Sequence, residues 1–276
     1  YLYSLSSLPL SATLIIGGSA DLYRDREKVI DKLLERNQFN PKFGLIWNPV
    51  PSTTFRMAGF RVMKRALIAN ETIEPTQVAG FLQFFDDFNA TDSKVYGIGL
   101  DQKFSSNLSG GIEFTRRDLD LPKIDVSSGD IFEENEKEKL GRGYLYWTPF
   151  TWAALSAEYQ FEHIDTEESF NVDFKTHRVP LGINLYHPEG VFVKLKATYM
   201  NQEGNFIDSS SIIFEGGDQY WICDASIGYR LPKRFGILSI EAKNLFDRTF
   251  MFEEIDTLNP LIQPDRLIIG KLTLSF

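Results

Sequence analysis

The sequence has little cysteine, no excess of basic charge and no long apolar run. Its single cysteine, Cys223, excludes an internal disulfide, and its place in a strand-like segment indicates a small packed side chain. The 29 basic residues are outnumbered by 38 acidic ones, a formal net charge of −9 that argues against nucleic acid as a partner. No segment approaches the ~20 consecutive apolar residues of a membrane-spanning helix.

Groups that carry chemistry are also scarce. The three histidines lack metal-ligand spacing, so we predict no metal site. Ser156 and His177 are conceivable hydrolase partners, but no local motif accompanies either residue. The pair Gly110-Gly111 lies in strand-like sequence and not in a phosphate-binding loop. We therefore predict no enzyme activity, no catalytic residue and no cofactor.

The pattern that does dominate the sequence is an alternation of apolar and polar residues. In 221–230, for example, Trp221, Ile227 and Tyr229 share one face, while Asp224 and Arg230 share the other. This period of two predicts β-strands with two different faces, as in transmembrane barrels. About twelve such strands are expected, at 10–23, 41–48, 53–66, 94–104, 107–117, 139–148, 152–162, 178–185, 191–200, 221–230, 236–248 and 265–276.

The connections between these segments alternate between short and long. Proline and glycine punctuate the short ones, and the long ones are polar and acidic. The short turns are predicted at 48–52, 105–107, 148–151, 187–190 and 231–234. Short periplasmic turns and long extracellular loops are typical of outer-membrane barrels. The acidic residues after Arg117 either solvate an exposed loop or form a vestibule that attracts cations. The long connections are predicted at 24–40, 67–93, 118–138, 163–171, 201–218 and 249–264.

Two long connections have further features, and the short turns carry aromatic residues. The spacing in 28–37 predicts a short loop helix, and 77–87 predicts an extra loop strand or hairpin. Trp47, Phe150 and Trp152 lie beside short turns, where an aromatic girdle at the membrane interface is expected. The alternative for these aromatics is an ordinary cluster in a soluble core.

The C-terminal segment ends in an alternating row of apolar residues: Phe276, Leu274 and Leu272. This row resembles the terminal strand of bacterial outer-membrane proteins, which the barrel-assembly machinery reads as a signal. The resemblance implies that the chain is located in the bacterial outer membrane, with outer-membrane lipid and the assembly machinery as partners.

Three shorter motifs resemble the barrels of TonB-dependent receptors. They are Ala242-Lys-Asn-Leu-Phe-Asp-Arg-Thr-Phe250, Asn40-Pro-Lys-Phe-Gly-Leu-Ile-Trp-Asn-Pro49 and Glu74-Pro-Thr-Gln-Val-Ala-Gly-Phe81. The plug and the TonB-contacting box of that family are not visible, and a complete receptor barrel has roughly twenty-two strands. Similar barrels also occur behind helical-repeat domains. The resemblance implies that the chain is the C-terminal part of such a barrel.

We expect one antiparallel transmembrane β-barrel domain over 1–276, with about twelve to fourteen strands. If the chain is a fragment, further strands, a periplasmic domain or a partner chain upstream of Tyr1 complete it. The expected function is transport of a polar solute or polymer, by a receptor-like or exporter-like barrel. The alternatives are a non-transporting anchor or scaffold that binds a surface partner through its loops, and a soluble all-β binding domain. The substrate and the direction of transport are not encoded in these patterns.

The inward face of the expected strands carries most of the charged candidates. They either line a path for solute or form ion-pair ladders between neighbouring strands. In 53–66 two rows compete for this face, one with Arg56 and Phe60 and the other with Phe55 and Met57. The lumen-lining candidates are Arg142, Glu158, Glu162, Arg178, Lys194, Lys196, Asp224, Arg230, Glu241, Lys243 and Lys271.

Overall fold

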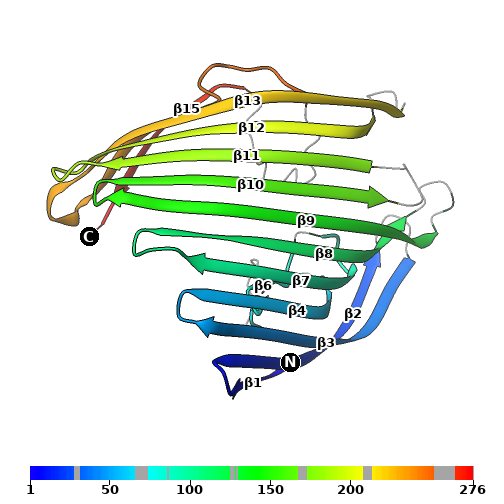
Figure 1. Cartoon of the computed structure of the whole chain (residues 1–276). Helices are drawn as coiled ribbons and strands as arrows, with labels where there is room; N and C mark the ends of the chain where they lie inside the picture. Colours follow the sequence, from blue (N-terminus) through cyan, green and yellow to red (C-terminus); the bar gives the residue numbers. More distant parts are fainter. Residues whose placement is uncertain are drawn as a thin grey trace. The chain divides into compact units, whose positions relative to one another are not determined.

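A computed structural model describes residues 1–27, 32–65, 74–85, 87–124, 128, 130–166, 173–207, 213–251 and 265–275. Within these residues, thirteen strands form one antiparallel sheet in which neighbours along the chain pair with each other (Figure 1). The number of strands falls in the predicted range of twelve to fourteen. The strands are β1 (Leu2–Leu8), β2 (Ala12–Glu27), β3 (Lys32–Val50), β4 (Thr53–Met63), β7 (Asp92–Lys103), β8 (Leu108–Ile124), β9 (Ile131–Phe150), β10 (Ala153–Thr166), β11 (Asp173–Tyr186), β12 (Val191–Ile207), β13 (Ile213–Arg230), β14 (Gly236–Lys243) and β15 (Leu267–Leu274).

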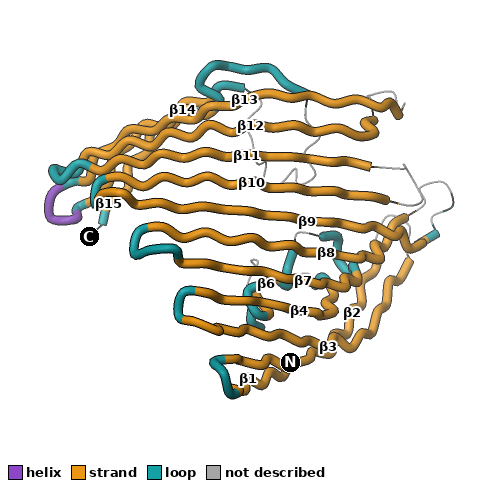
Figure 2. The backbone as a smooth tube through the Cα atoms, viewed as in Figure 1, coloured by secondary structure: helices purple, strands orange, loops and turns teal. Residues whose placement is uncertain are grey.

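The remaining elements are small. Strands β5 (Gln77–Val78) and β6 (Phe81–Leu82) form a separate two-stranded sheet, which confirms the predicted loop hairpin. A short 3-10 turn, η2 (Pro232–Arg234), connects β13 to β14 (Figure 2). Nowhere in the described part of the chain does a helix have the length and hydropathy needed to cross a membrane.

The chain divides into two compact units. Unit 1 comprises residues 1–102, 112–141 and 163–173, and unit 2 comprises residues 103–111, 142–162 and 174–276. That the whole chain is one domain stays a prediction.

Several strands extend well into segments predicted as loops. The predicted helix at 28–37 is wrong for its described part, because 32–37 continue β3 and pair with β2, while 28–31 lie outside the described residues. An ion pair of 2.8 Å between Arg24 and Glu35 joins the two strands there. Ladder hydrogen bonds with a neighbouring strand thus outweigh the local helical spacing.

The predicted acidic loop at 118–138 is largely strand as well. Asp118 belongs to β8, and Glu134 and Glu138 belong to β9. Their carboxylates form ion pairs with neighbouring cations, at 3.2 Å between Lys123 and Glu134 and at 2.5 Å between Arg117 and Glu138. The described acidic residues are therefore largely neutralised by cations within the same unit.

The outward face of the strands is apolar and exposed in both units. In unit 2, Leu195, Ile227 and Leu274 have exposed fractions of 46%, 55% and 50%. In unit 1, Ile16 and Ile98 are exposed in the same way. Large apolar side chains in continuous exposed rows are the pattern of a surface that contacts hydrocarbon.

Aromatic residues gather where these outward rows meet the short turns. Phe150 and Trp152 stack with ring centroids 5.1 Å apart, and Trp47 stacks on Phe55 at 5.5 Å. The indole of Trp47 donates a hydrogen bond of 3.1 Å to the carbonyl of Leu10. Exposed rings with a bonded polar edge suit the interface between lipid and water.

In unit 1 the β5–β6 hairpin packs onto the inward face. Val78, Ala79 and Phe81 form a buried cluster with Phe60 of β4 and Val95 of β7. Glycines on this face make room for the hairpin, since a Cβ on Gly97 would overlap the ring of Phe81. The segment Glu74–Phe81, which resembles a receptor strand in sequence, therefore lies outside the thirteen-stranded sheet.

This packing also settles which row of β4 faces inward. Ala58, Phe60 and Val62 are buried, whereas Phe55 and Met57 are exposed. Arg56 lies on the same inward row as Ala58 and forms ion pairs with Asp101 and Glu113.

The receptor-like motif at 242–250 forms a tight turn in unit 2. Asn244 is buried with φ of 46°, and its side chain hydrogen-bonds both the N–H and the carbonyl of Arg248, at 2.9 and 3.0 Å. Its own N–H donates to Asp224 at 3.0 Å. The ring of Phe250 then stacks on Tyr220 at 4.5 Å. The motif thus fixes how the chain leaves β14.

Candidate solute-binding cavity

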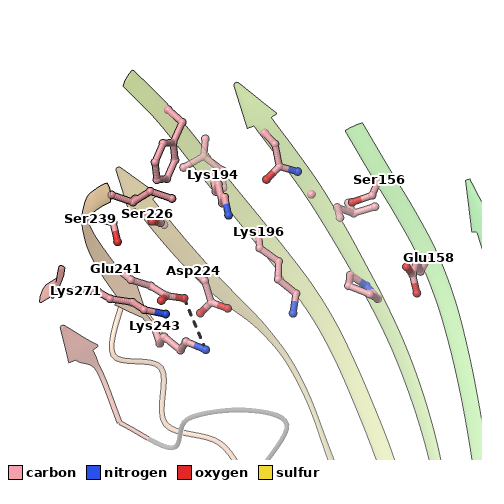
Figure 3. A pocket seen from close by; sticks show the side chains of 18 of the residues that line it. Ser156, Glu158, Lys194, Lys196, Asp224, Ser226, Ser239, Glu241, Lys243 and Lys271 are labelled. Atoms are coloured by element: carbon pink, nitrogen blue, oxygen red, sulfur yellow. Dashed lines mark ion pairs between the residues drawn. The ribbon is translucent and has the colours of Figure 1, made fainter. Parts of the chain in front are cut away.

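A polar cavity of about 650 Å³ lies on the inward face of unit 2. It spans β10 to β15, near the ends of β12 and β14 that adjoin short turns. Seven of the eleven predicted lumen-lining residues meet there, among them Lys194 and Lys196 (Figure 3). The other five are Glu158, Asp224, Glu241, Lys243 and Lys271.

The strand register explains why these side chains share one face. Residues directly opposite each other in an antiparallel pair point to the same side of the sheet. Lys194 is opposite Asn184 on β11 and Ser226 on β13. Lys271 of β15 is opposite Ser239 of β14. The serine and asparagine neighbours, which the sequence argument did not select, supply hydrogen-bonding groups between the charges.

One side of the cavity is a connected polar network. The guanidinium of Arg142 donates two hydrogen bonds to Glu158, at 3.0 and 3.1 Å. Tyr146 and Gln160 also donate to this carboxylate, and Arg178 donates to Gln160 at 2.6 Å. Glu158 is therefore fully engaged, and this group behaves as the ion-pair ladder that was the alternative expectation.

The other acidic residues of the cavity have partners of their own. Asp224 accepts the N–H of Asn244, as described above, and Glu241 lies 3.7 Å from the ammonium of Lys243. Lys194, Lys196 and Lys271 form no ion pair with any residue that the structure describes. Lys194 lies over the ring of Phe192 at 5.5 Å.

Four lumen-lining candidates lie outside the cavity. Arg142 and Arg178 belong to the network around Glu158, and Glu162 lies farther along β10. Arg230 stacks over the ring of Tyr186 at 5.5 Å, near the turn after β13. Whether any of the eleven residues contacts a solute stays a prediction.

The predicted assembly signal is only partly described. Leu272 and Leu274 are exposed, as is every residue of β15, and Phe276 lies outside the described residues.

A buried ionic cluster holds the hairpin of unit 1, and sequence reasoning missed its central residue, Glu74. The carboxylate of Glu74 lies 2.9 Å from Lys42 and 2.6 Å from Arg65, and it accepts a hydrogen bond of 2.8 Å from Tyr3. The side chains of Lys42 and Glu74 are 0% and 1% exposed. The small residues on the inward rows of β3 and β7, such as Gly44 and Gly97, were the available sign that a segment packs there.

Glu74 lies outside the spanning strands, and its pKa is lowered. Burial alone would raise the pKa of this carboxyl, but hydrogen bonds with Lys42 and Tyr3, and the charges of Lys42 and Arg65, outweigh the burial. The carboxylate therefore stays ionised and holds the cluster together.

The two conceivable hydrolase partners, Ser156 and His177, lie on opposite faces of the sheet. Ser156 lines the cavity, while His177 hydrogen-bonds the hydroxyl of Tyr159 at 2.8 Å, on the opposite face of the sheet. Within the described segments, no three His, Cys, Asp or Glu side chains are placed to hold a metal ion.

No family model matches the chain, and no curated protein matches it. Solved structures do match. The FrpB iron transporter from Neisseria meningitidis superposes with a TM-score of 0.69 at 11% identity, over 96% of this chain and 43% of that protein. FpvA from Pseudomonas aeruginosa, solved with a pyoverdine–iron complex, gives 0.65 at 11% identity, over 97% of this chain and 37% of that protein.

The ferric-catecholate import receptor Fiu from Escherichia coli K12 gives a TM-score of 0.57 at 13% identity, over 96% of this chain and 42% of that protein. The chain thus spans 37–43% of the length of these three proteins. At such low identity the similarity concerns the fold alone. The chain has the antiparallel transmembrane β-barrel fold of TonB-dependent receptors.

Proposed function

We propose that the chain forms part of the wall of an outer-membrane transport barrel, through which a polar solute passes. The observation that carries the proposal is the two-sided strand of unit 2. One row of side chains is apolar and exposed, as at Leu195 and Ile227, and the other lines a charged cavity. Such strands separate lipid from an aqueous path.

The similar structures support a transport role, since FrpB is described as an iron transporter and Fiu as an import receptor. The sheet order supports a larger assembly. Strands β1 and β15 lie at its two ends, and each has one neighbour among the described strands. We propose that further strands complete the barrel, so that this chain is the C-terminal part of a receptor-like or exporter-like protein located in the outer membrane.

The proposal is tested by the passage of a neutral sugar into liposomes that contain the native protein. The variant Gly182→Trp should slow the passage, because Gly182 lines the cavity and lies against Ser156. The matched control is Gly270→Trp, on the outward row, where no heavy atom lies within 4 Å of an added Cβ. Equal rates for both variants, or no passage above protein-free liposomes, would contradict transport.

A second candidate is a non-transporting scaffold. The observation that favours it is the β5–β6 hairpin, which covers part of the inward face of unit 1 with a buried apolar cluster. Among the similar structures, FpvAI has been solved in complex with pyocin S2. A sealed barrel in the liposome assay, together with tight binding of a surface protein, would favour this candidate.

A further inference from the structure

We infer that the cavity of unit 2 binds a soluble solute that carries several oxyanion groups, phosphate or carboxylate, through Lys194, Lys196 and Lys271. This inference rests on the proposed function and narrows its solute from polar to anionic. The cavity volume of about 650 Å³ is within the range of pockets that hold small-molecule ligands.

The inward cations of the two units include a clear contrast. In unit 1, Lys42 lies 2.9 Å from Glu74, and Arg56 lies 2.6 Å from Asp101. These two cations are neutralised by carboxylates of the same unit. In unit 2, the described residues offer Lys194, Lys196 and Lys271 no ion pair.

The strand register places neutral residues opposite two of these lysines. Lys194 faces Asn184 and Ser226, and Lys271 faces Ser239. All three of these neighbours are neutral and can donate hydrogen bonds to an anion. A ladder built for stability would place acids opposite the lysines, since opposite charges across strands stabilise a sheet.

Lys196 also lacks an ion pair with the described residues, although an acid lies opposite it. Asp224 is directly opposite it in the register, yet the two side chains form no ion pair. Asp224 instead accepts the N–H of Asn244 at 3.0 Å, where it anchors the turn after β14. Figure 3 shows Lys196 and Asp224 beside each other, with no ion pair drawn between them. The acid directly opposite Lys196 is thus engaged by the turn after β14.

The lining of the cavity carries a net positive charge. The four lysines Lys194, Lys196, Lys243 and Lys271 stand against the three carboxylates of Glu158, Asp224 and Glu241, so the formal charge is +1. The chain as a whole carries −9. A local positive site in an acidic protein concentrates anions. Lysine binds phosphate and carboxylate as a point charge, with three donors that adapt to the ligand.

The position of the cavity distinguishes a soluble anion from a lipid headgroup. The lysines belong to the inward row, while the outward row of the same strands, including Leu195 and Ile227, is the one that contacts hydrocarbon. A headgroup bound at the lysines would leave its acyl chains on the aqueous side of the sheet.

The test is a calorimetric titration of the native protein in a zwitterionic detergent, without phosphate buffer. The two probes are inorganic tripolyphosphate and citrate, and they separate phosphate from carboxylate recognition. Each single variant Lys194→Gln, Lys196→Gln and Lys271→Gln should raise Kd about fivefold, and the triple variant about a hundredfold. Added salt should weaken binding by the native protein.

Lys233→Gln is the matched control, because Lys233 is an exposed lysine in the turn between β13 and β14, outside this cavity. Its Kd should equal that of the native protein. Heat-modifiable mobility on gels should be the same for all variants, which shows that they fold. Binding by the triple variant as tight as native binding, or an equal loss in Lys233→Gln, would overturn the inference.

The same preparations in liposomes separate the inference from the function on which it rests. A protein that passes a neutral sugar but binds neither probe refutes anion recognition and leaves transport standing. A protein that binds a probe through these lysines but passes no solute supports the anion site and refutes transport.

Discussion

Replacing Glu74 by glutamine should release the β5–β6 hairpin from the inward face of unit 1. The carboxylate of Glu74 lies between Lys42 and Arg65, at 2.9 and 2.6 Å, with both Lys42 and Glu74 almost completely buried. The glutamine would keep the hydrogen bond with Tyr3 but leave two cations without their shared anion. Removing one partner of a buried ion pair costs about 3–5 kcal/mol, and the lower end applies here because Arg65 is partly exposed and also lies 3.5 Å from Asp21.

The assay is hydrogen–deuterium exchange of the amides in 74–85, in detergent, followed by mass spectrometry. A destabilisation of about 3 kcal/mol should accelerate exchange of the hairpin by about a hundredfold, while amides of β12 and β13 keep their native rates. The double variant Lys42→Met, Glu74→Leu removes the buried Lys42–Glu74 pair and leaves Arg65 beside Asp21, so it should recover most of the protection. Native exchange rates in Glu74→Gln, or no recovery in the double variant, would refute the role given to this cluster.

The pH dependence of the same readout follows from the lowered pKa of Glu74. A carboxyl whose pKa is lower in the folded state stabilises that state fully above its unfolded pKa, near 4.5, and loses the contribution as pH falls through the folded value. Protection of 74–85 should therefore be constant from neutral pH to about 5 and fall in more acidic solution. In Glu74→Gln this acid-induced loss should be absent.

Three further outcomes are expected. Gly97→Val should displace Phe81 and destabilise the protein by about 1–3 kcal/mol, measured by urea unfolding in micelles, since overpacking of a buried contact costs that much. Asn244→Ala should cost about 1–3 kcal/mol in the same assay, because two hydrogen bonds of a buried side chain are lost; an unchanged midpoint would contradict the role of the turn. Ile227→Arg should reduce insertion into liposomes, by about 2–4 kcal/mol if the residue lies near the bilayer midplane. Ser226→Arg, on the inward row, should insert normally.

Much of the sheet could be predicted from the sequence because a period of two has a direct physical origin. In 191–200 and 221–230, one row is apolar, as a surface facing hydrocarbon requires, and the other is largely polar, as a surface facing water requires. The two faces of each strand can therefore be assigned residue by residue. The same alternation predicted that Lys194, Lys196 and Asp224 lie on one face of the sheet, and all three line the cavity of unit 2. The positions of the short turns followed equally well, since proline and glycine have backbone preferences that act locally.

The sequence did not predict the features that depend on distant partners. The segment 32–37 has helical spacing, yet it pairs with β2, and only the neighbouring strand provides its hydrogen-bond partners. The acidic segment around Glu134 has the composition of a loop, but Lys123 neutralises that carboxylate across the strand pair. Glu74 was likewise hidden, because its partners Lys42 and Tyr3 lie 32 and 71 positions away in the sequence.

The two end strands have a consequence for how the protein enters a membrane. β1 and β15 are exposed almost throughout, and in the described sheet each pairs along one side only. In hydrocarbon, an amide group without a hydrogen bond costs several kcal/mol. The seven residues of β1 and the eight of β15 would therefore make a lone inserted sheet prohibitively unstable. Membrane insertion and the pairing of the end strands are therefore thermodynamically coupled. The sheet is stable in a bilayer only when the outer edges of β1 and β15 are hydrogen-bonded to further strands.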